Sequence, residues 1–551
     1  MLSQIFHFAI VLFLDCNLKV EKMFRLLFLI LVLFASCQKS VPLHEKTLRI
    51  NICADPQTLD PRKARDLTTI TLMRMMFEGL TRTSHSGELE LALAHNVEIS
   101  DDSTQFVFHL RKSFWSNGDP VTSDDFAKSW KSILDPAFPT DIAYQLYVIK
   151  NGRKAKQGEI DKDQIGIKTP DPYTLVVELE QPTPYFLELV SMTSFFPIPS
   201  KTVSETADWG LNAGSLVGNG PFAIESWSHG DQIRIVKNPK YWEADEVKIG
   251  RIDLFMVSGD TEMRMFEEGK IDWAGSPLST IPVDALADLK AKEDLQISPL
   301  SGTYFFRVNT ADRIKEKKNP LSSPNFRKAL AIALNRADIA EHILQGGQMA
   351  AKSLVPPEMG LSEEGYFLDN QKETAGSFLV KGLSELNLSL NELEPIVISY
   401  SSSEKNASIA QAIQKQWETT LRIRVLLEAV EPKVYFQRLS QKQFQLAAGS
   451  WIADFNDPIN FLEVFKYKDA STNNTNWESP KYVDLLNQSA LSSESGERKR
   501  ILSEAEGILM DQMPIIPIFH FAMNYLQTDH LEEVALSPIG QIDFRWSTLG
   551  N

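Results

Sequence analysis

Cysteine and histidine are scarce in this 551-residue chain, which contains three cysteines and nine histidines. The histidines form no HExxH pattern, and the sequence has no CxxC, no GxSxG and no glycine-rich loop ending in GKS or GKT. These absences remove the usual sequence signs of a zinc hydrolase, a thiol redox enzyme, a serine hydrolase and a P-loop protein. We therefore expect no catalytic residues, no cofactor and no bound metal.

Positive charge is in deficit. The chain has 56 lysines and arginines against 72 aspartates and glutamates, so its formal net charge is −16. Binding to nucleic acid requires clustered basic side chains that neutralise phosphates. The acidic balance therefore argues against a nucleic-acid partner.

Long apolar runs are also missing after Cys37, where none approaches the roughly 20 residues of a membrane-spanning helix. Residues 26–35 form an apolar run that follows Arg25. Its length is typical of the hydrophobic region of a secretory signal, which is shorter than a membrane span. We interpret residues 1–36 as a signal peptide.

The end of this run resembles the lipobox of bacterial lipoproteins, because the small residues Ala35 and Ser36 precede Cys37. Acylation would make Cys37 the mature N-terminus and anchor the protein to a membrane through the linker 37–45. The alternative is an ordinary signal peptide with a chance cysteine. Because Met23 opens a complete signal, we expect translation to start there, although a longer leader is the alternative reading.

The pattern of the chain changes near residue 300. Before it, alternating segments such as 233–236 and 252–255 predict strands. After it, residues 395–400, 404–421 and 422–428 predict strand, helix and strand. Such a βαβ unit implies a parallel sheet, in which ligands meet the carboxyl ends of the strands. A chain this long exceeds the roughly 250 to 300 residues of a single core, so we expect at least two lobes.

One block, residues 106–130, combines three local signals. Phe106, Phe108 and Leu110 alternate with Val107, His109 and Arg111, which is the period of a half-buried strand. Asn117-Gly118 suits a turn with positive φ, and residues 122–125 offer hydroxyl and carboxylate caps to a helix. The block by itself predicts a mixed α/β fold.

The same block closely resembles the signature F-x-L-R-x-x-x-x-W-x-(N/D)-G-x-P-(V/F)-T-A-x-D-F-x-x-S-(W/F) of the solute-binding proteins of ABC peptide permeases, the oligopeptide- and dipeptide-binding family. The likeness continues in the family's order from about residue 49 to residue 517. The further landmarks are Thr58-Leu59-Asp60-Pro61, Met76-Phe77-Glu78-Gly79-Leu80, Gly218-Asn219-Gly220-Pro221-Phe222, Tyr241-Trp242, Phe326-Arg327-Lys328-Ala329-Leu330 and Trp451-Ile452-Ala453-Asp454-Phe455-Asn456-Asp457-Pro458.

The resemblance implies an α/β fold, namely a bilobal periplasmic binding protein of class II type. Two mixed α/β lobes are then joined by a hinge and accompanied by a small extra α/β domain. The implied map assigns residues 46–77, 201–300 and 521–551 to lobe I, residues 78–200 to the extra domain and residues 301–520 to lobe II.

The resemblance also implies a function. A monomer on the periplasmic side of a bacterial membrane captures short peptides between its lobes and delivers them to the permease subunits of an ABC importer. Muropeptides are the near alternative. Nickel or haem are bound by other members of the family, but the sequence near Trp451 lacks a cluster of histidines or methionines. A secreted peptidase is the rival class, and it would need a nucleophile or metal set that the sequence does not provide.

Asp454 is the strongest candidate for a binding residue. Pro458 suits the first turn of a helix over residues 459–465, so Asp457 is the natural N-cap and Asp454 has no capping role. In the resembled family, the aspartate at this motif position pairs with the α-ammonium of the peptide. The alternative is that Asp454 is only a turn residue.

Other residues are expected to complete the site through a sheet edge, because an extended peptide can add to one by main-chain hydrogen bonds. We expect this edge from Gly449, Ser450, Trp451 and Ile452 and from Gly275 and Ser276. The aromatic residues Tyr304, Phe305, Trp451 and Phe455 are expected to line pockets. The alternative for Tyr304 is a place in the core, together with Phe306.

The sequence departs from better-known family members where those meet the ligand carboxylate. Ala448 stands in place of an arginine, and Asn406 stands in place of a histidine. We therefore expect amine recognition to be kept and carboxylate recognition to be altered. Arg65, Lys433 and Arg438 are the candidates for a substitute cation.

Overall fold

A single mixed sheet runs through most of the chain and sets the frame for the rest. The computed structural model describes residues 46–550 except 65, 315 and 493, so the predicted signal peptide, the lipid site at Cys37 and the candidate Arg65 lie outside the described residues. In spatial order, the sheet consists of β17 (Val425–Val430), β16 (Ile396–Ser401), β18 (Leu446–Ile452), β12 (Gln296–Val308), β19 (Ile515–Gln527), β11 (Trp273–Gly275), β1 (Thr47–Asn51), β10 (Arg251–Phe255), β9 (Gln232–Lys237) and β8 (Phe222–Ser228), with β15 (Met349–Ala350) on β19.

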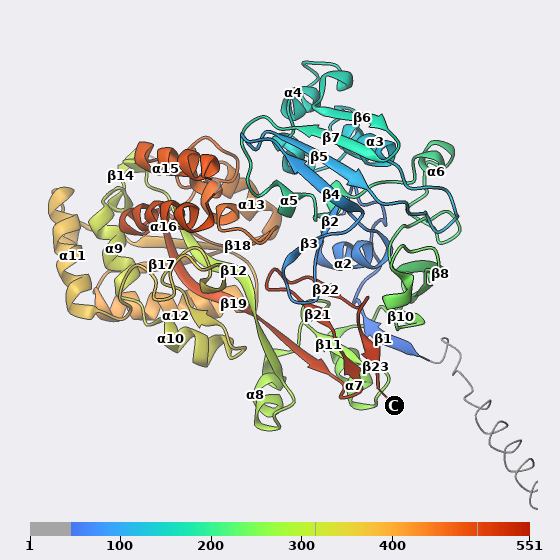
Figure 1. Ribbon diagram of the computed structural model, residues 1–551. Helices are drawn as coiled ribbons and strands as arrows, with labels where there is room; N and C mark the ends of the chain where they lie inside the picture. Colours follow the sequence, from blue (N-terminus) through green and yellow to red (C-terminus); the bar gives the residue numbers. More distant parts are fainter. Residues whose placement is uncertain (1–45, 65, 315, 493, 551) are drawn as a thin grey trace, which may run out of the picture. The chain divides into compact units, whose positions relative to one another are not determined.

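The two longest strands of this sheet, β12 and β19, have 13 residues each and pair antiparallel along most of their length. They run from the part of the sheet flanked by α9 (Pro324–Ile332), α12 (Glu404–Thr420) and α16 (Ser495–Gln512) to the part that holds β1 and β10 (Figure 1). Their register shifts between Pro299 and Thr303 and again between Tyr304 and Phe305. These irregularities bend and twist the ladder where one half of the sheet passes into the other.

The predicted βαβ unit is confirmed. β16 and β17 pair in parallel from Ile396 with Val425 to Ser401 with Val430, and α12 connects them. The Ser403 side chain caps α12 by accepting from the amide of Asn406. The apolar face of α12 is buried against the sheet as its period requires, with Ile409, Ile413 and Trp417 inside.

A second, four-stranded antiparallel sheet lies within residues 78–200, the range predicted for the extra domain. Its order is β4 (Ala94–Ile99), β5 (Gln105–Leu110), β7 (Thr174–Glu178) and β6 (Ile167–Asp171). The block at residues 106–130 behaves as its sequence predicts, with a strand, a turn at Gly118 (φ 96°) and α3 (Ser123–Ile133) behind a capping box of Thr122 and Asp125. The Phe126 and Trp130 side chains of α3 are buried.

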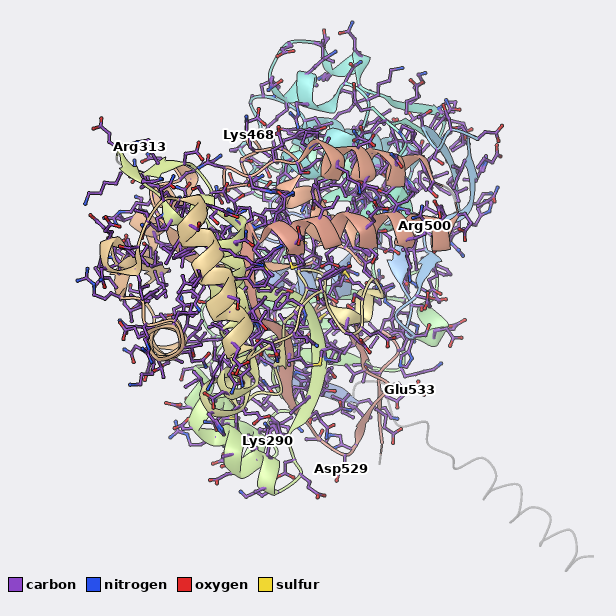
Figure 2. The ribbon with its side chains drawn as sticks, turned by 90° about the vertical axis from the view of Figure 1, so that its left-hand side faces the viewer. Lys290, Arg313, Lys468, Arg500, Asp529 and Glu533 are labelled. Atoms are coloured by element: carbon purple, nitrogen blue, oxygen red, sulfur yellow. The ribbon has the colours of Figure 1, made fainter. Side chains whose placement is uncertain are left out.

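At the opposite end of β19 from the α16 group, small helices close the sheet. α7 (Gly259–Glu267) and α8 (Val283–Ala291) pack apolar side chains against this end, where Leu286 and Leu526 belong to one buried cluster. Figure 2 shows Lys290 of α8 and Asp529, just beyond β19, at the same end of the molecule. None of the helices in the described part of the chain is long and apolar enough to cross a membrane.

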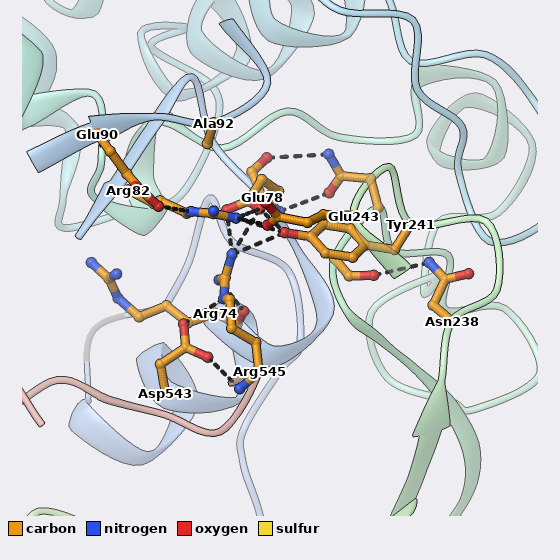
Figure 3. Close-up of polar contacts among 12 residues, drawn as sticks. Arg74, Glu78, Arg82, Glu90, Ala92, Asn238, Tyr241, Glu243, Asp543 and Arg545 are labelled. Carbon is orange, nitrogen blue, oxygen red and sulfur yellow. Dashed lines mark hydrogen bonds and ion pairs between the residues drawn. The ribbon is translucent and has the colours of Figure 1, made fainter. Parts of the chain in front are cut away.

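A buried cluster of charged side chains ties together three distant segments of the chain (Figure 3). Residues 74–90 supply Arg74, Glu78, Arg82 and Glu90, residues 241–243 supply Tyr241 and Glu243, and residues 543–545 supply Asp543 and Arg545. Each guanidinium donates to at least one oxygen of the cluster or of the backbone. The cluster therefore fastens the C-terminal segment to the region between the two sheets.

Candidate ligand-binding cavity

The candidate site is a cavity of about 1010 Å³ between residues 144–192 and residues 451–472. One wall comes from the segment that contains the second sheet, and the other follows the end of β18 in the large sheet. A volume of this order accommodates a ligand of several residues.

The second wall is shaped by the turn between β18 and α14 (Ile459–Leu462), which a short 3-10 helix, Glu463–Phe465, continues. Asp457 is engaged as predicted, because its Oδ1 accepts from the amide of Ile459 at 2.9 Å and its carboxylate pairs with Arg498. The helix predicted over residues 459–465 is confirmed. Asp454 is left with its side chain in the cavity wall.

Asn460 holds this turn together, although the sequence did not single it out. Its Oδ1 accepts from the indole nitrogen of Trp451 at 2.8 Å and from the amide of Asp454 at 3.2 Å. One amide oxygen therefore fixes both the Trp451 ring and the backbone that carries the Asp454 carboxylate. The signal was available in the sequence only as an asparagine in the first turn of the predicted helix, which is a common position for a solvated residue.

Asp454 has no basic partner among the described residues. Burial raises the pKa of its carboxyl group above the ordinary value of 3.8. The pKa of Tyr144, on the facing wall, is raised to about 12, chiefly by burial and further by the Asp454 carboxylate. A desolvated carboxylate without a counter-charge is costly, so this position favours a cationic ligand group.

Aromatic side chains from both walls meet near this carboxylate. The rings of Tyr185 and Phe455 stack with their centroids 5.4 Å apart and their planes 5° from parallel. Tyr147 lines the first wall and Trp451 lines the second. The cavity thus combines the Asp454 carboxylate, which has no basic partner among the described residues, with apolar surfaces, as small-ligand sites commonly do.

The expected sheet edge exists in β18. Its neighbour β16 pairs only with Leu446 and Ala447, whereas β12 pairs with β18 as far as Ile452. Within the described residues no strand pairs with residues 448–452 on the side opposite β12, and the Ser450 and Ile452 side chains are exposed. The Ala448 carbonyl accepts from the Tyr435 hydroxyl, and beyond it this edge, which includes Gly449, is open to an added strand.

The structure does not bring the remaining predicted residues into the cavity. Phe305 is fully buried against Phe465, with ring centroids 6.0 Å apart, because its face of β12 is covered by residues 459–465. Tyr304 points to the other face, where it stacks on Phe519 and donates to Asn406 Oδ1 at 3.2 Å.

Gly275 and Ser276 also lie apart from the cavity, and their amides are already bonded. The Gly275 amide donates to the Ser279 hydroxyl at 2.8 Å, and the Ser276 amide donates to the Asn524 carbonyl at 2.8 Å. Of the candidate cations, Arg438 pairs with Glu428 at 2.7 Å. The described residues hold no group of three or more histidine, cysteine, aspartate or glutamate side chains placed to bind a metal ion.

Comparison with known proteins decides the family. The profile described as "Bacterial extracellular solute-binding proteins, family 5 Middle" matches residues 88–473. The chain belongs to this family. The bilobal α/β fold of family 5 solute-binding proteins, predicted from the sequence, is thereby confirmed.

Among family 5 relatives, the oligopeptide-binding protein OppA of Bacillus subtilis is 40% identical over 506 residues, which cover 91% of this chain and 92% of that protein. Among solved structures, the unliganded open form of the periplasmic murein tripeptide-binding protein MppA matches with a TM-score of 0.78 at 26% identity, covering 92% of this chain and 97% of MppA. Haemophilus influenzae OppA in complex with the peptide RPPGFSPFR matches with a TM-score of 0.74 at 26% identity, covering 92% of this chain and 99% of the OppA chain.

Proposed function

We propose that the cavity binds short peptides and that Asp454 receives their α-ammonium group. The observation that carries this proposal is a partly buried carboxylate, at the end of an open strand edge, that has no basic partner in the described part of the chain. Every unblocked peptide supplies the missing cation, and its backbone supplies the hydrogen bonds that the edge of β18 lacks. Relatives that are named for binding oligopeptides support this reading.

The protein acts as a monomeric carrier and not as an enzyme. Closure of the two lobes encloses the peptide, and the closed form presents it to the permease of an ABC importer. Trp451, Tyr185 and Phe455 offer contacts that tolerate different side chains. A murein peptide is the second candidate ligand, since a protein named for murein tripeptides has a similar structure.

Native mass spectrometry and calorimetry test the proposal together. The purified protein is expected to retain masses of short peptides and, once emptied, to bind tetra-alanine but bind N-acetyl tetra-alanine far more weakly. Retained murein fragments in place of peptides would favour the second candidate. Failure to bind any peptide, or hydrolysis of the peptide during the titration, would contradict the proposal.

The carrier is secreted and tethered by lipid at Cys37. The apolar run before this cysteine supports the signal, and the family description as extracellular is consistent with export. Cys37→Ala is expected to release the protein from the membrane fraction, whereas Cys53→Ala is expected to leave the fractionation unchanged. Membrane association that persists in Cys37→Ala would contradict the lipid tether.

A further inference from the structure

Arg307 of β12 is a buried cation without an acidic partner among the residues that the structure describes. Its exposure is 7%, its Nε has no hydrogen-bond partner, its Nη1 packs over Gly449 of β18, and its guanidinium lies 4.9 Å from the centre of the Phe305 ring. Burial lowers its pKa. Arg336 and Arg545 are buried even more deeply, but they pair with Asp369 and Glu78.

The Arg307 side chain crosses β18 through a gap left by a glycine. A Cβ atom on Gly449 would lie 1.6 Å from Nη1 of Arg307, so the guanidinium occupies the place of a side chain at position 449. Arg307 lies on β12, opposite Ala447 in the register. Its guanidinium therefore reaches over β18 toward the open edge on the far side.

This guanidinium lies on the cavity side of the ladder. Trp451 and Gly449 are two residues apart in β18, and side chains two apart share one face of a strand. Trp451 lines the cavity, so the face that Arg307 crosses is the face that leads to the cavity. The rise between them is about 7 Å along the strand.

We propose that Arg307 binds the α-carboxylate of a peptide that lies along the open edge of β18 with its ammonium at Asp454. The inference rests on the proposed peptide function and adds the second charge of the ligand. The strand part of this edge, residues 449–452, spans about 10 Å, Asp454 lies in the bend just beyond it, and an extended peptide spans about 3.3 to 3.6 Å per residue. The substrate class is therefore short linear peptides with both termini free.

The chemistry accounts for the unusual state of Arg307. A guanidinium binds a carboxylate through two parallel hydrogen bonds, and such charge-assisted bonds are strongest where water is excluded. The free protein leaves the Arg307 Nε without a partner, which is costly unless a ligand completes the pair. Ala448, which replaces the arginine of the resembled family members, has no group for this role.

The test is calorimetry with tetra-alanine and its C-terminal amide on the full secreted chain. Amidation is expected to weaken binding to the wild type by about 10- to 100-fold, as removal of a charged hydrogen-bond partner does. In Arg307→Gln the acid is expected to bind as weakly as the amide, with a difference below about threefold. Unchanged binding of the amide shows that the variant is folded.

A second variant keeps the charge and moves it. Gly449→Ala places a methyl group on the guanidinium site and is expected to lose the preference for the acid in the same way. Arg424→Gln removes a charge from an exposed position of the same lobe and is expected to behave as the wild type.

Two outcomes separate the inference from the function on which it rests. Suppose that the wild type binds tetra-alanine and that amidation still weakens binding to Arg307→Gln and Gly449→Ala. Arg307 then does not bind the α-carboxylate, and the peptide-binding function is unaffected. If the wild type binds neither tetra-alanine nor its amide, the proposal that the cavity binds short peptides is contradicted as well.

Discussion

Glu78 and Arg545 form a buried ion pair across 467 positions of the chain, with Arg545 Nη1 at 3.0 Å from Glu78 Oε1 and 2.8 Å from Glu78 Oε2 (Figure 3). Their side chains are 1% and 4% exposed. The hydroxyl of Tyr241 also donates to Glu78, and Arg82 lies 3.3 Å from it. The arginines Arg82 and Arg545 keep the pKa of Glu78 below its ordinary value despite burial.

Arg545→Met is expected to destabilise the protein by about 3 kcal/mol, because it leaves Glu78 with one arginine in a desolvated cluster. Adding Glu78→Gln to this variant is expected to recover part of the loss, since the two changes act on one interaction. Urea unfolding measures both. Lys317→Met is the control, because it breaks the exposed pair with Glu394 and is expected to cost less than about 1 kcal/mol. Equal losses of unfolding free energy in Arg545→Met and Lys317→Met would contradict the structural role of the pair of Glu78 and Arg545.

Asp454→Asn is expected to weaken peptide binding by about 2 to 5 kcal/mol, the usual loss when one member of a buried charge pair is removed. N-acetylation of the peptide is expected to weaken binding to the wild type and to add little in the variant, because both changes delete one interaction. Calorimetry on the four combinations measures this coupling.

Asp469→Asn is the matched control for this cycle, since Asp469 lines the same cavity but its side chain is exposed. Its effect on affinity is expected to stay within about threefold, as for other solvated charges. Full additivity of the Asp454 substitution and acetylation would mean that the amine is recognised elsewhere.

Acidification is expected to weaken peptide binding in the wild type. Burial raises the pKa of Asp454 above 3.8, so its carboxylate takes up a proton at a higher pH than an ordinary aspartate does. The α-ammonium of the ligand stays charged throughout this range. Affinity should therefore be constant near neutral pH and fall as the pH drops through the Asp454 pKa, while Asp454→Asn shows no such fall. Parallel pH profiles for the two proteins would contradict the assignment.

Local signals in the sequence predicted those elements whose partners are near in the chain. The alternation in residues 106–110, the cap at Asp457 and the βαβ unit around α12 each depend on neighbours within one or two elements. Asp454 was singled out because it occupies the aspartate position of the resembled family's motif and because Asp457, three residues on, already had a capping role.

Positions that depend on long-range packing were not predictable in this way. Tyr304 and Phe305 lie next to each other, and only the helices that cover each face of β12 decide that both are buried. The contacts of Arg307 with Gly449 and of Glu78 with Arg545 require the final strand pairing. A glycine within a strand and a charged residue between apolar neighbours were the available signals.

Glu506 of α16 is a second buried carboxylate without a basic partner in the described part of the chain. Its Oε1 accepts from the amides of Leu354 and Val355 at 2.8 and 2.7 Å, and its Oε2 has no hydrogen-bond partner. Burial raises its pKa from 4.5 to about 7. The folded protein therefore keeps a proton on Glu506 between about pH 4.5 and 7, whereas the unfolded chain loses it.

The stability of the wild type is thus expected to fall as the pH rises from 4.5 to 7, and the Glu506 contribution amounts to at most about 3 kcal/mol. Glu506→Gln keeps an oxygen for the two amides and cannot ionise. Its free energy of unfolding should therefore rise relative to that of the wild type as the pH increases from 4.5 to 7. His520, whose pKa burial lowers to about 3, titrates in both proteins and cancels in their difference. Urea unfolding at pH 5 and pH 8 measures that difference. A difference that does not change between the two pH values would show that Glu506 is ionised in the folded protein throughout.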